Sequence, residues 1–135
     1  MEARQYAPLS LAFIGDAVYA VAVREFLLRE GDRKVKQFHN DAVAFVRSSA
    51  QSRAVRALWD ELTEEEQGYV RRGRNTSSAV PKHSTVSDYR YATGFETLLG
   101  FLYLEGRQDR LQHLLKRSIE VLREGEEHGT DESSC

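Results

Sequence analysis

The sequence has little cysteine and proline, and no long apolar run. Its only cysteine, Cys135, is the last residue, which excludes a disulfide framework and a cysteine-built zinc site. No uncharged apolar run reaches the roughly 18 residues of a membrane span, and no basic segment precedes an apolar one at the start. No glycine-rich phosphate loop of either common type occurs. We therefore expect a protein of the reducing cytoplasm, with no membrane contact and no nucleotide cofactor.

Acidic charge is concentrated at one end of the chain. The 135 residues include 19 Lys and Arg against 21 Asp and Glu, and five of these acids lie in residues 124–135, which contain no Lys or Arg. We expect one domain over residues 1–123 and a disordered, solvated acidic tail over residues 124–135. Without the tail, 19 basic residues stand against 16 acidic ones. The resulting net charge of +3 permits a polyanionic partner.

The hydrophobic periodicity is helical, and no segment alternates with the period of a β-strand. Pro8 fits the first turn of a long helix, Thr63 and Glu66 form a capping box, and Gly106 ends a helix. Residues 71–84 are rich in loop-forming residue types. The expected helices cover residues 9–28, 35–58 with a break near 48–49, 63–73, 87–104 and 109–123. The sequence thus predicts a single all-α domain.

Two carboxylates interrupt the two most apolar helices. Asp16 is the only charged residue in residues 8–23, and Glu96 is the only one in residues 91–104. A helix that is apolar on nearly every side is typically buried, and an ionised carboxylate there needs a partner or a metal. We expect Asp16 and Glu96 to lie together and to hold Mg²⁺, which takes oxygen ligands and few carboxylates. Such an ion would activate water and neutralise charge on a phosphate.

The simpler interpretation is that each acid forms an ion pair with an arginine. The candidates are Arg24, Arg47, Arg53 and Arg90. Asp16 has no Lys or Arg within seven residues, which weighs against this interpretation. We also expect glycines to let the central helices approach closely, because glycine has no Cβ. The glycines concerned are Gly15, Gly94 and Gly100.

Residues 71–83 carry four fixed positive charges and no acid. Glycine, asparagine and hydroxyl side chains there would let phosphates approach. Few exposed aromatic residues are left to stack on single strands, so phosphate and shape recognition of double-stranded RNA fits better. A solvated surface loop is the alternative. The candidate RNA-binding residues are Arg71, Arg72, Arg74, Asn75 and Lys82.

The segments around the two acids resemble motifs of ribonuclease III domains. Residues 11–19, LAFIGDAVY, resemble the family's signature helix, and residues 95–103, FETLLGFLY, resemble its second acidic motif. The small size and three short segments match the Mini-ribonuclease III branch more closely. These segments are RGRN at 72–75, VPK at 80–82 and YRY at 89–91. The resemblance covers about residues 9–122.

The resemblance implies a ribonuclease III-type helical domain that forms a homodimer and hydrolyses phosphodiesters of double-stranded RNA with Mg²⁺. In the Mini branch the substrate is a precursor of large-subunit ribosomal RNA, which implies a role in rRNA processing and ribosome biogenesis. The family's signature aspartate falls on Asp16 and its second-motif glutamate on Glu96. No double-stranded-RNA-binding domain is expected after the last helix.

Two positions depart from full-length ribonucleases III. Ala12 stands where one acidic ligand would be, and Thr93 stands where the second motif usually has Asp. The number of metal ions and a water-mediated role of Thr93 therefore stay open. The missing acids leave a non-catalytic double-stranded-RNA-binding helical dimer as the alternative function. A helical protein-interaction domain with arginine-paired acids is a further alternative.

Overall fold

The computed structural model describes residues 1–76, 80–82 and 84–133, with side chains described up to residue 125. Regular structure in these residues is helical and includes no strand, so the predicted all-α class is confirmed. The helices are α1 (Pro8–Glu30), α2 (Val35–Val46), α3 (Ser48–Ala57), α4 (Glu64–Thr76), α5 (Val86–Leu104) and α6 (Gln108–Ser133), with short 3₁₀ turns η1 (Ala3–Gln5) and η2 (Trp59–Glu61). Within the part described, no helix is long and apolar enough to cross a membrane.

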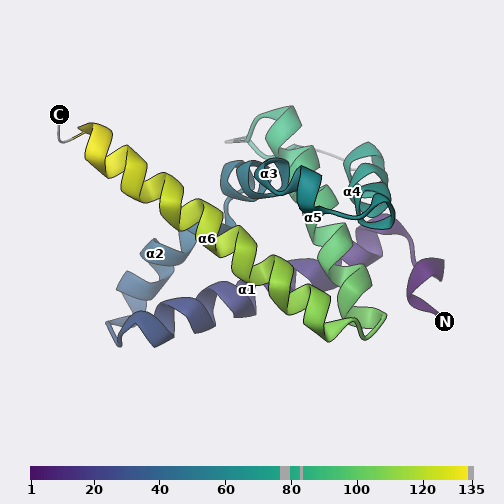
Figure 1. The fold of residues 1–135 in the computed structure, drawn as a ribbon, viewed down its shortest axis with the longest axis horizontal. Coiled ribbons are helices and arrows are strands. Elements are labelled where there is room, and N and C mark those ends of the chain that lie inside the picture. Colours follow the sequence, from purple (N-terminus) through teal and green to yellow (C-terminus); the bar gives the residue numbers. More distant parts are fainter. Residues whose placement is uncertain (77–79, 83, 134–135) are drawn as a thin grey trace.

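Helix α5 is the centre of the fold. It contacts α1, α3, α4 and α6, and nearly every residue from Ala92 to Leu102 is buried. Helix α6 lies across α1 and α5, and α2 packs against α1 and α3 (Figure 1). The core includes Tyr19 of α1, whose hydroxyl donates to the carbonyl oxygen of Phe45 at 2.9 Å and whose ring packs edge-on against Phe95.

Helices α1 and α5 approach so closely that two contact positions admit only glycine. A Cβ on Gly15 would lie 1.8 Å from the carbonyl oxygen of Glu96, and a Cβ on Gly100 would lie 1.9 Å from that of Leu11. Each helix therefore presents a glycine to the backbone of the other. Gly94 has the same role between α5 and α4, where a Cβ would lie 2.4 Å from the carbonyl oxygen of Val70. The predicted role of these three glycines is confirmed.

Helix α4 begins at the predicted capping box and is longer than expected. The Glu66 amide donates to Thr63 Oγ1 at 3.1 Å, and the Thr63 amide donates to Glu66 Oε1 at 2.9 Å. The helix continues to Thr76, so the predicted end near residue 73 is wrong and residues 74–76 do not belong to the expected loop. Gly73 does not end the helix because it packs against α5, where a Cβ would lie 2.2 Å from Thr97 Oγ1. Residues 77–79 and 83 of the expected loop lie outside the described residues.

The other helix boundaries follow the sequence pattern, except at α6. Arg47 has extended backbone between α2 and α3, which confirms the predicted break. Gly106 follows α5 with φ of 77°, a conformation that favours glycine, and confirms the predicted stop. Helix α6 continues beyond the predicted end at Arg123, to Ser133.

Helix α1 is buried on one side only. Its buried side consists of Leu11, Ala12, Gly15, Tyr19, Val23 and Leu27. On the other side Phe13 is 80% exposed and Val21 is 63% exposed. Asp16 is exposed as well, so the expectation that this helix is buried around its whole circumference is wrong for a single chain. Both sides of α1 are apolar, and the sequence alone does not distinguish a side that faces the core from one that does not.

Replacing Gly100 with Ala should lower the free energy of unfolding by about 3 kcal/mol, because the new methyl group would force α1 and α5 apart. Gly68 of α4 is the matched control, since a Cβ there meets nothing within 4 Å. Gly68→Ala should raise the free energy of unfolding by up to about 1 kcal/mol. Urea unfolding monitored by circular dichroism measures both changes. Equal effects of the two substitutions would contradict the close approach.

Candidate functional site

The crossing of α1 and α5 places Asp16 beside Glu96. Gly15 packs directly on the backbone of Glu96, and Asp16 is the next residue of α1. The side chains are close enough to share a hydrogen bond. Asp16 is exposed and Glu96 is half-buried, so the pair lies where solvent meets the interior. The structure thus brings together the two acids that the sequence singled out.

The surroundings of Glu96 favour its protonated form. Burial, the hydrogen bond with Asp16 and the negative charge of Asp16 raise the pKa of Glu96 from 4.5 to about 8, and a hydrogen bond from Gln51 acts in the opposite direction. The pKa of the Tyr19 hydroxyl is also raised, by burial and then by the charge of Glu96. Two adjacent carboxyl groups thus share a proton near neutral pH unless a cation replaces it.

No basic side chain neutralises this pair. Among the side chains that the structure describes, neither Asp16 nor Glu96 forms an ion pair with Lys, Arg or His. The buried acid that does pair is Glu66, which receives two hydrogen bonds of 2.8 Å from Arg110. The simpler interpretation, in which each of the two acids has its own arginine, is therefore not supported.

Glu96 lines a cavity of about 500 Å³ between α3 and the beginning of α5. Much of its wall is polar and includes Arg47, Ser48, Ser49, Gln51, Ser84 and Thr93. Hydroxyls of Ser48 and Ser84 share a hydrogen bond of 2.7 Å. The Thr93 hydroxyl donates to the carbonyl oxygen of Tyr89 at 3.0 Å, which leaves its lone pairs as acceptors. Thr93, whose role the sequence left open, is thus a wall residue of this cavity.

Gln51 is a buried polar residue that the sequence analysis missed. It is 3% exposed, its Nε2 donates to the carbonyl oxygen of Val46 at 2.8 Å, and the same nitrogen lies 3.5 Å from Glu96 Oε2. Its Oε1 is buried without a hydrogen-bond partner in the described residues, which costs about 1–3 kcal/mol. Gln51 shares an apolar stripe of α3 with Val55. The signal that identified Asp16 and Glu96, a lone charge in a very apolar helix, could not have found it, because α3 is polar and contains two arginines.

These groups form a donor set that suits a hard divalent cation. Carboxylates from two helices and the Thr93 hydroxyl offer oxygen, the ligand atom that Mg²⁺ prefers, and Gln51 lines the same cavity. A cation would also replace the shared proton of the pair. No group of three or more His, Cys, Asp or Glu suited to a metal occurs among the residues described, so Asp16 and Glu96 are the acids of the set.

The predicted RNA-binding residues lie on two segments. The last turns of α4 carry Arg71, Arg72, Arg74 and Asn75. Lys82 is exposed and follows Pro81, which lines the Glu96 cavity. The guanidinium groups of Arg71 and Arg72 lie over the rings of Trp59 and Tyr69, at 5.2 and 4.7 Å. Helix α4 contributes no lining residue to the cavity, although Gly73 packs next to Thr97, the neighbour of Glu96.

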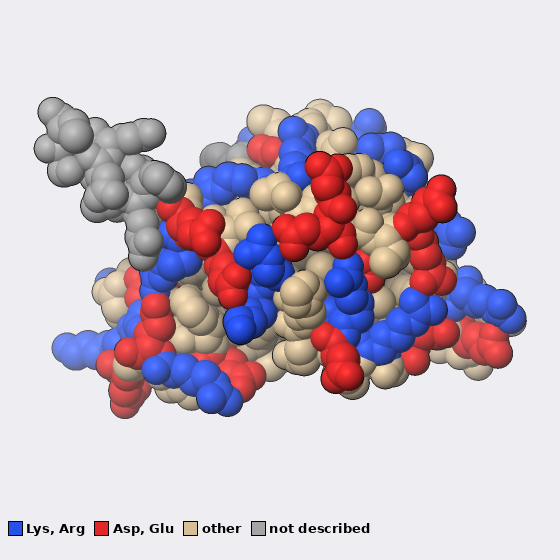
Figure 2. Space-filling model, viewed as in Figure 1, with Lys and Arg blue, Asp and Glu red and all other residues tan. Residues whose placement is uncertain are grey.

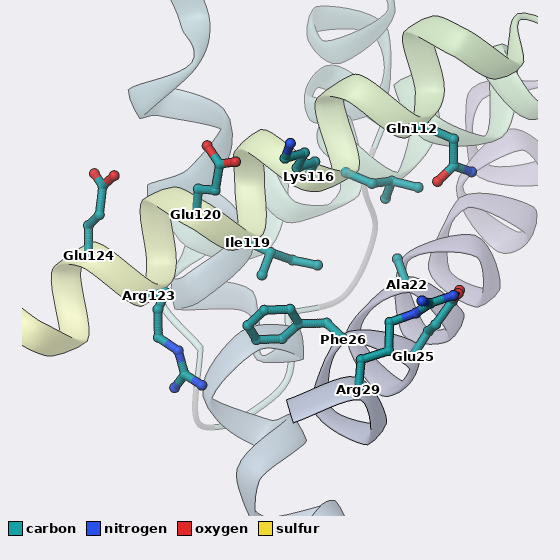
Figure 3. A pocket seen from close by; sticks show the side chains of 11 residues that line it. Ala22, Glu25, Phe26, Arg29, Gln112, Lys116, Ile119, Glu120, Arg123 and Glu124 are labelled. Atoms are coloured by element: carbon teal, nitrogen blue, oxygen red, sulfur yellow. The ribbon is translucent and has the colours of Figure 1, made fainter. Parts of the chain in front are cut away.

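A cavity of about 550 Å³ between α1 and α6 is larger than the one at Glu96. Phe26 and Ile119 face each other across it, and charged side chains from both helices surround them (Figure 3). None of the sequence-predicted site residues lines this cavity. Its apolar interior is suited to protein packing rather than to phosphate chemistry.

Known proteins resemble the chain over most of its length. The model of the Ribonuclease III domain matches residues 9–107, which include Asp16 and Glu96. The chain is 47% identical to a Mini-ribonuclease 3 of Thermoanaerobacter sp. (strain X514) over 118 residues, 87% of this chain and 83% of that protein. It is 40% identical to a Mini-ribonuclease 3 of Clostridium tetani over 134 residues, 94% of this chain and 89% of that protein.

A solved structure agrees with this assignment. The crystal structure of a Fusobacterium nucleatum protein superposes with a TM-score of 0.80 at 27% identity, and the match covers 87% of this chain and 96% of that chain. The sequence matches, the helical fold and the two acids at the crossing of α1 and α5 lead to one conclusion. The chain belongs to the ribonuclease III family, in its Mini-ribonuclease 3 branch, and is an endoribonuclease.

Proposed function

We propose that the chain is a Mg²⁺-dependent endoribonuclease that cleaves double-stranded RNA at Asp16 and Glu96. The observation that carries this proposal is the adjacency of the two carboxyl groups, which form no ion pair with a basic side chain among the described residues. Two acids from different helices repel each other, and packing alone gives no reason to place them together. A divalent cation supplies that reason, and family members act on double-stranded RNA.

In this proposal each residue of the site has a separate task. Asp16 and Glu96 would hold the cation, with Glu96 in its ionised form. Thr93 offers a further oxygen atom from the cavity wall, and Gln51 faces Glu96 with its Nε2. Arg47, on the same wall, places a positive charge where a substrate phosphate would enter. Bound Mg²⁺ supplies an activated water and stabilises negative charge that develops on the phosphate.

RNA is held in this proposal by Arg71, Arg72, Arg74, Asn75 and Lys82. Side chains at the end of α4 are largely exposed, and two of the guanidinium groups rest on aromatic rings rather than on acids. Such groups keep their charge and their N–H donors for phosphate oxygens. Binding through them should weaken as salt rises, because bound phosphates release counterions.

The active form in this proposal is a homodimer that assembles through the exposed side of α1. Members of the family generally act as dimers. The exposed side chains there include Leu9 at 42%, Phe13 at 80%, Val21 at 63% and Leu28 at 58%. The cavity between α1 and α6 adds further apolar surface beside this side (Figure 3). A two-fold axis would give two sites, each cutting one strand of the duplex in a staggered break.

The proposal also covers the natural substrate, the compartment and the extent of the catalytic unit. Resemblance to the Mini-ribonuclease III branch supports a large-subunit ribosomal RNA precursor as the substrate and the cytoplasm as the compartment. Residues 1–123 form the catalytic unit in this scheme, since they contain every residue assigned a task, and residues 124–135 form an acidic tail outside the site.

Asp16→Asn and Glu96→Gln should each abolish cleavage of a labelled RNA duplex in Mg²⁺, because each removes a charge that holds the cation. Glu105→Gln is the matched control for Glu96→Gln, since Glu105 directly follows α5 and is not at the pair. The control should cut like the unchanged chain. A gel assay with Mg²⁺ and with chelator measures the rates. Cleavage by either site variant at the full rate would contradict the mechanism, and duplex binding by the unchanged chain without cleavage would favour the non-catalytic alternative.

Glu96→Gln should stabilise the protein at pH 8 when divalent cations are absent. The pKa of Glu96 is about 8 in the folded protein against an ordinary value of 4.5, so the folded state holds the proton more tightly. As pH rises from about 4.5 to about 8, ionisation of Glu96 therefore lowers the free energy of unfolding of the unchanged chain. The glutamine variant has no such group and does not show this loss. Unfolding in chelator at several pH values, repeated with Mg²⁺, measures the difference. Parallel pH curves for the two proteins would refute this assignment.

Phe13→Asp should convert the dimer into a monomer, because it would bury a carboxylate in an apolar interface. Phe13→Leu is the matched control and should leave the dimer intact. Since Phe13 is 80% exposed in the single chain, neither change should disturb the fold. Light scattering after size-exclusion chromatography measures the mass, and circular dichroism checks the fold. A Phe13→Asp variant that remains dimeric would place the interface elsewhere.

A further inference from the structure

Arginines in this protein have two kinds of partner. On the face that α6 crosses, basic and acidic side chains alternate (Figure 2). Arginines of α6 pair there with acids, as Arg110 does with Glu66 and Arg117 does with Glu61. Arg56, at the end of α3, differs. Its guanidinium carbon lies 4.2 Å from the centre of the Tyr91 ring, and its Nη2 donates to the hydroxyl of Ser87.

Both partners of Arg56 are neutral. No Asp or Glu among the described residues forms an ion pair with it, so its positive charge is undiminished. The side chain is nevertheless held in place, because the ring and the Ser87 hydroxyl both belong to α5. A guanidinium on an aromatic face loses less freedom when it binds an anion than a freely moving one does.

A second guanidinium reaches the same ring. The Arg74 guanidinium carbon lies 5.5 Å from the centre of the Tyr91 ring, and Arg74 Nη1 donates to the Tyr91 hydroxyl at 3.3 Å. Both guanidinium groups therefore lie over the Tyr91 ring, and Arg74 also bonds to its hydroxyl. The two distances place the groups within about 10 Å of each other, which is a Debye length at about 0.1 M salt. Two like charges held this close repel each other and attract an anion.

We propose that Arg56 and Arg74, arranged by Tyr91, form a binding site for the phosphate backbone of duplex RNA. The inference rests on the proposed function and adds Arg56, Ser87 and Tyr91 to the residues that serve RNA. The site draws on three helices: Arg56 from α3, Arg74 from α4, and both Tyr91 and Ser87 from α5. Because two guanidinium groups lie over it, the Tyr91 ring in this proposal positions charge rather than stacking on a base.

The location agrees with such a contact. Tyr91 precedes Glu96 by about 7.5 Å along the axis of α5, given the rise of an α-helix. Helix α3 carries Ser49 and Gln51 of the Glu96 cavity at one end and Arg56 at the other. A duplex whose scissile phosphate lies at Glu96 would extend a neighbouring part of its backbone to this pair of arginines. In this proposal the two arginines position the RNA and do not touch the cation.

The test measures binding of a labelled RNA duplex by fluorescence anisotropy, in chelator and over a series of salt concentrations. Arg56→Gln is the main variant, because it removes the charge but can still donate to Ser87. It should weaken binding about tenfold at low salt and reduce the slope of log affinity against log salt by about 1. Arg56→Lys restores the charge without the planar group, so it should restore the slope but only part of the affinity.

Arg53→Gln is the matched control. Arg53 is exposed, has the same charge and lies three residues before Arg56 on the same helix. A smaller effect of Arg53→Gln than of Arg56→Gln supports the site. Thermal unfolding shows whether the variants stay folded, and Arg56→Lys tests the site if Arg56→Gln does not. If the Arg56 variants have the same affinity and the same salt slope as Arg53→Gln, this inference is overturned and the proposed function is not. Failure of the unchanged chain to bind the duplex would overturn the proposed function as well.

Discussion

The rest of the site depends on the close crossing of α1 and α5. Gly15 and Gly100 let each helix rest on the backbone of the other, so no side chain separates the two helices at these points. The same contact determines where the acids lie, because Asp16 follows Gly15 in the chain and Gly15 packs on Glu96 itself. Backbone packing therefore sets the position of the carboxyl pair, and no hinge or loop has to bring it together. A site built on two packed helices is more rigid than one built on loops.

The electrostatic cost of the pair indicates what it is for. Burial and the neighbouring charge raise the pKa of Glu96 to about 8, whereas Glu66, also buried, has a lowered pKa because Arg110 binds it. Among the residues described, Glu66 thus has an arginine partner and Glu96 has none. Gln51, next to Glu96, has a side-chain oxygen without a hydrogen-bond partner among the same residues. An uncompensated acid reduces stability, and a bound cation would compensate it.

Much of this arrangement follows from the sequence, and the exceptions have physical causes. Apolar periodicity, the capping box at Thr63 and the lone acids Asp16 and Glu96 are local signals. The structure confirms the helices and the capping box and brings the two acids together, although Asp16 is exposed. Gly73 was misinterpreted as a helix end because a glycine that ends a helix and a glycine that packs against another helix are identical in sequence. The contact between Arg56 and Tyr91 was not predicted because residues 35 positions apart meet only in the folded chain. Helix propensity carries no information on such contacts.

The exposed position of Asp16 resolves an apparent conflict between burial and access. A carboxyl pair enclosed in the core would have a strongly raised pKa but would be closed to a polyanion as large as duplex RNA. Helix α1 does not enclose the pair in this way. One of its apolar sides packs on α5, and the other is exposed in the single chain. Asp16 lies at the edge between these sides. A partner chain that covers Phe13 and Val21 would bury the remaining apolar surface while leaving the pair at the rim, where it can meet a phosphate. Catalysis would then require α1 to stay accessible at Asp16, whereas assembly would require its apolar side to be covered. A change in α1 that affects one of these should also affect the other.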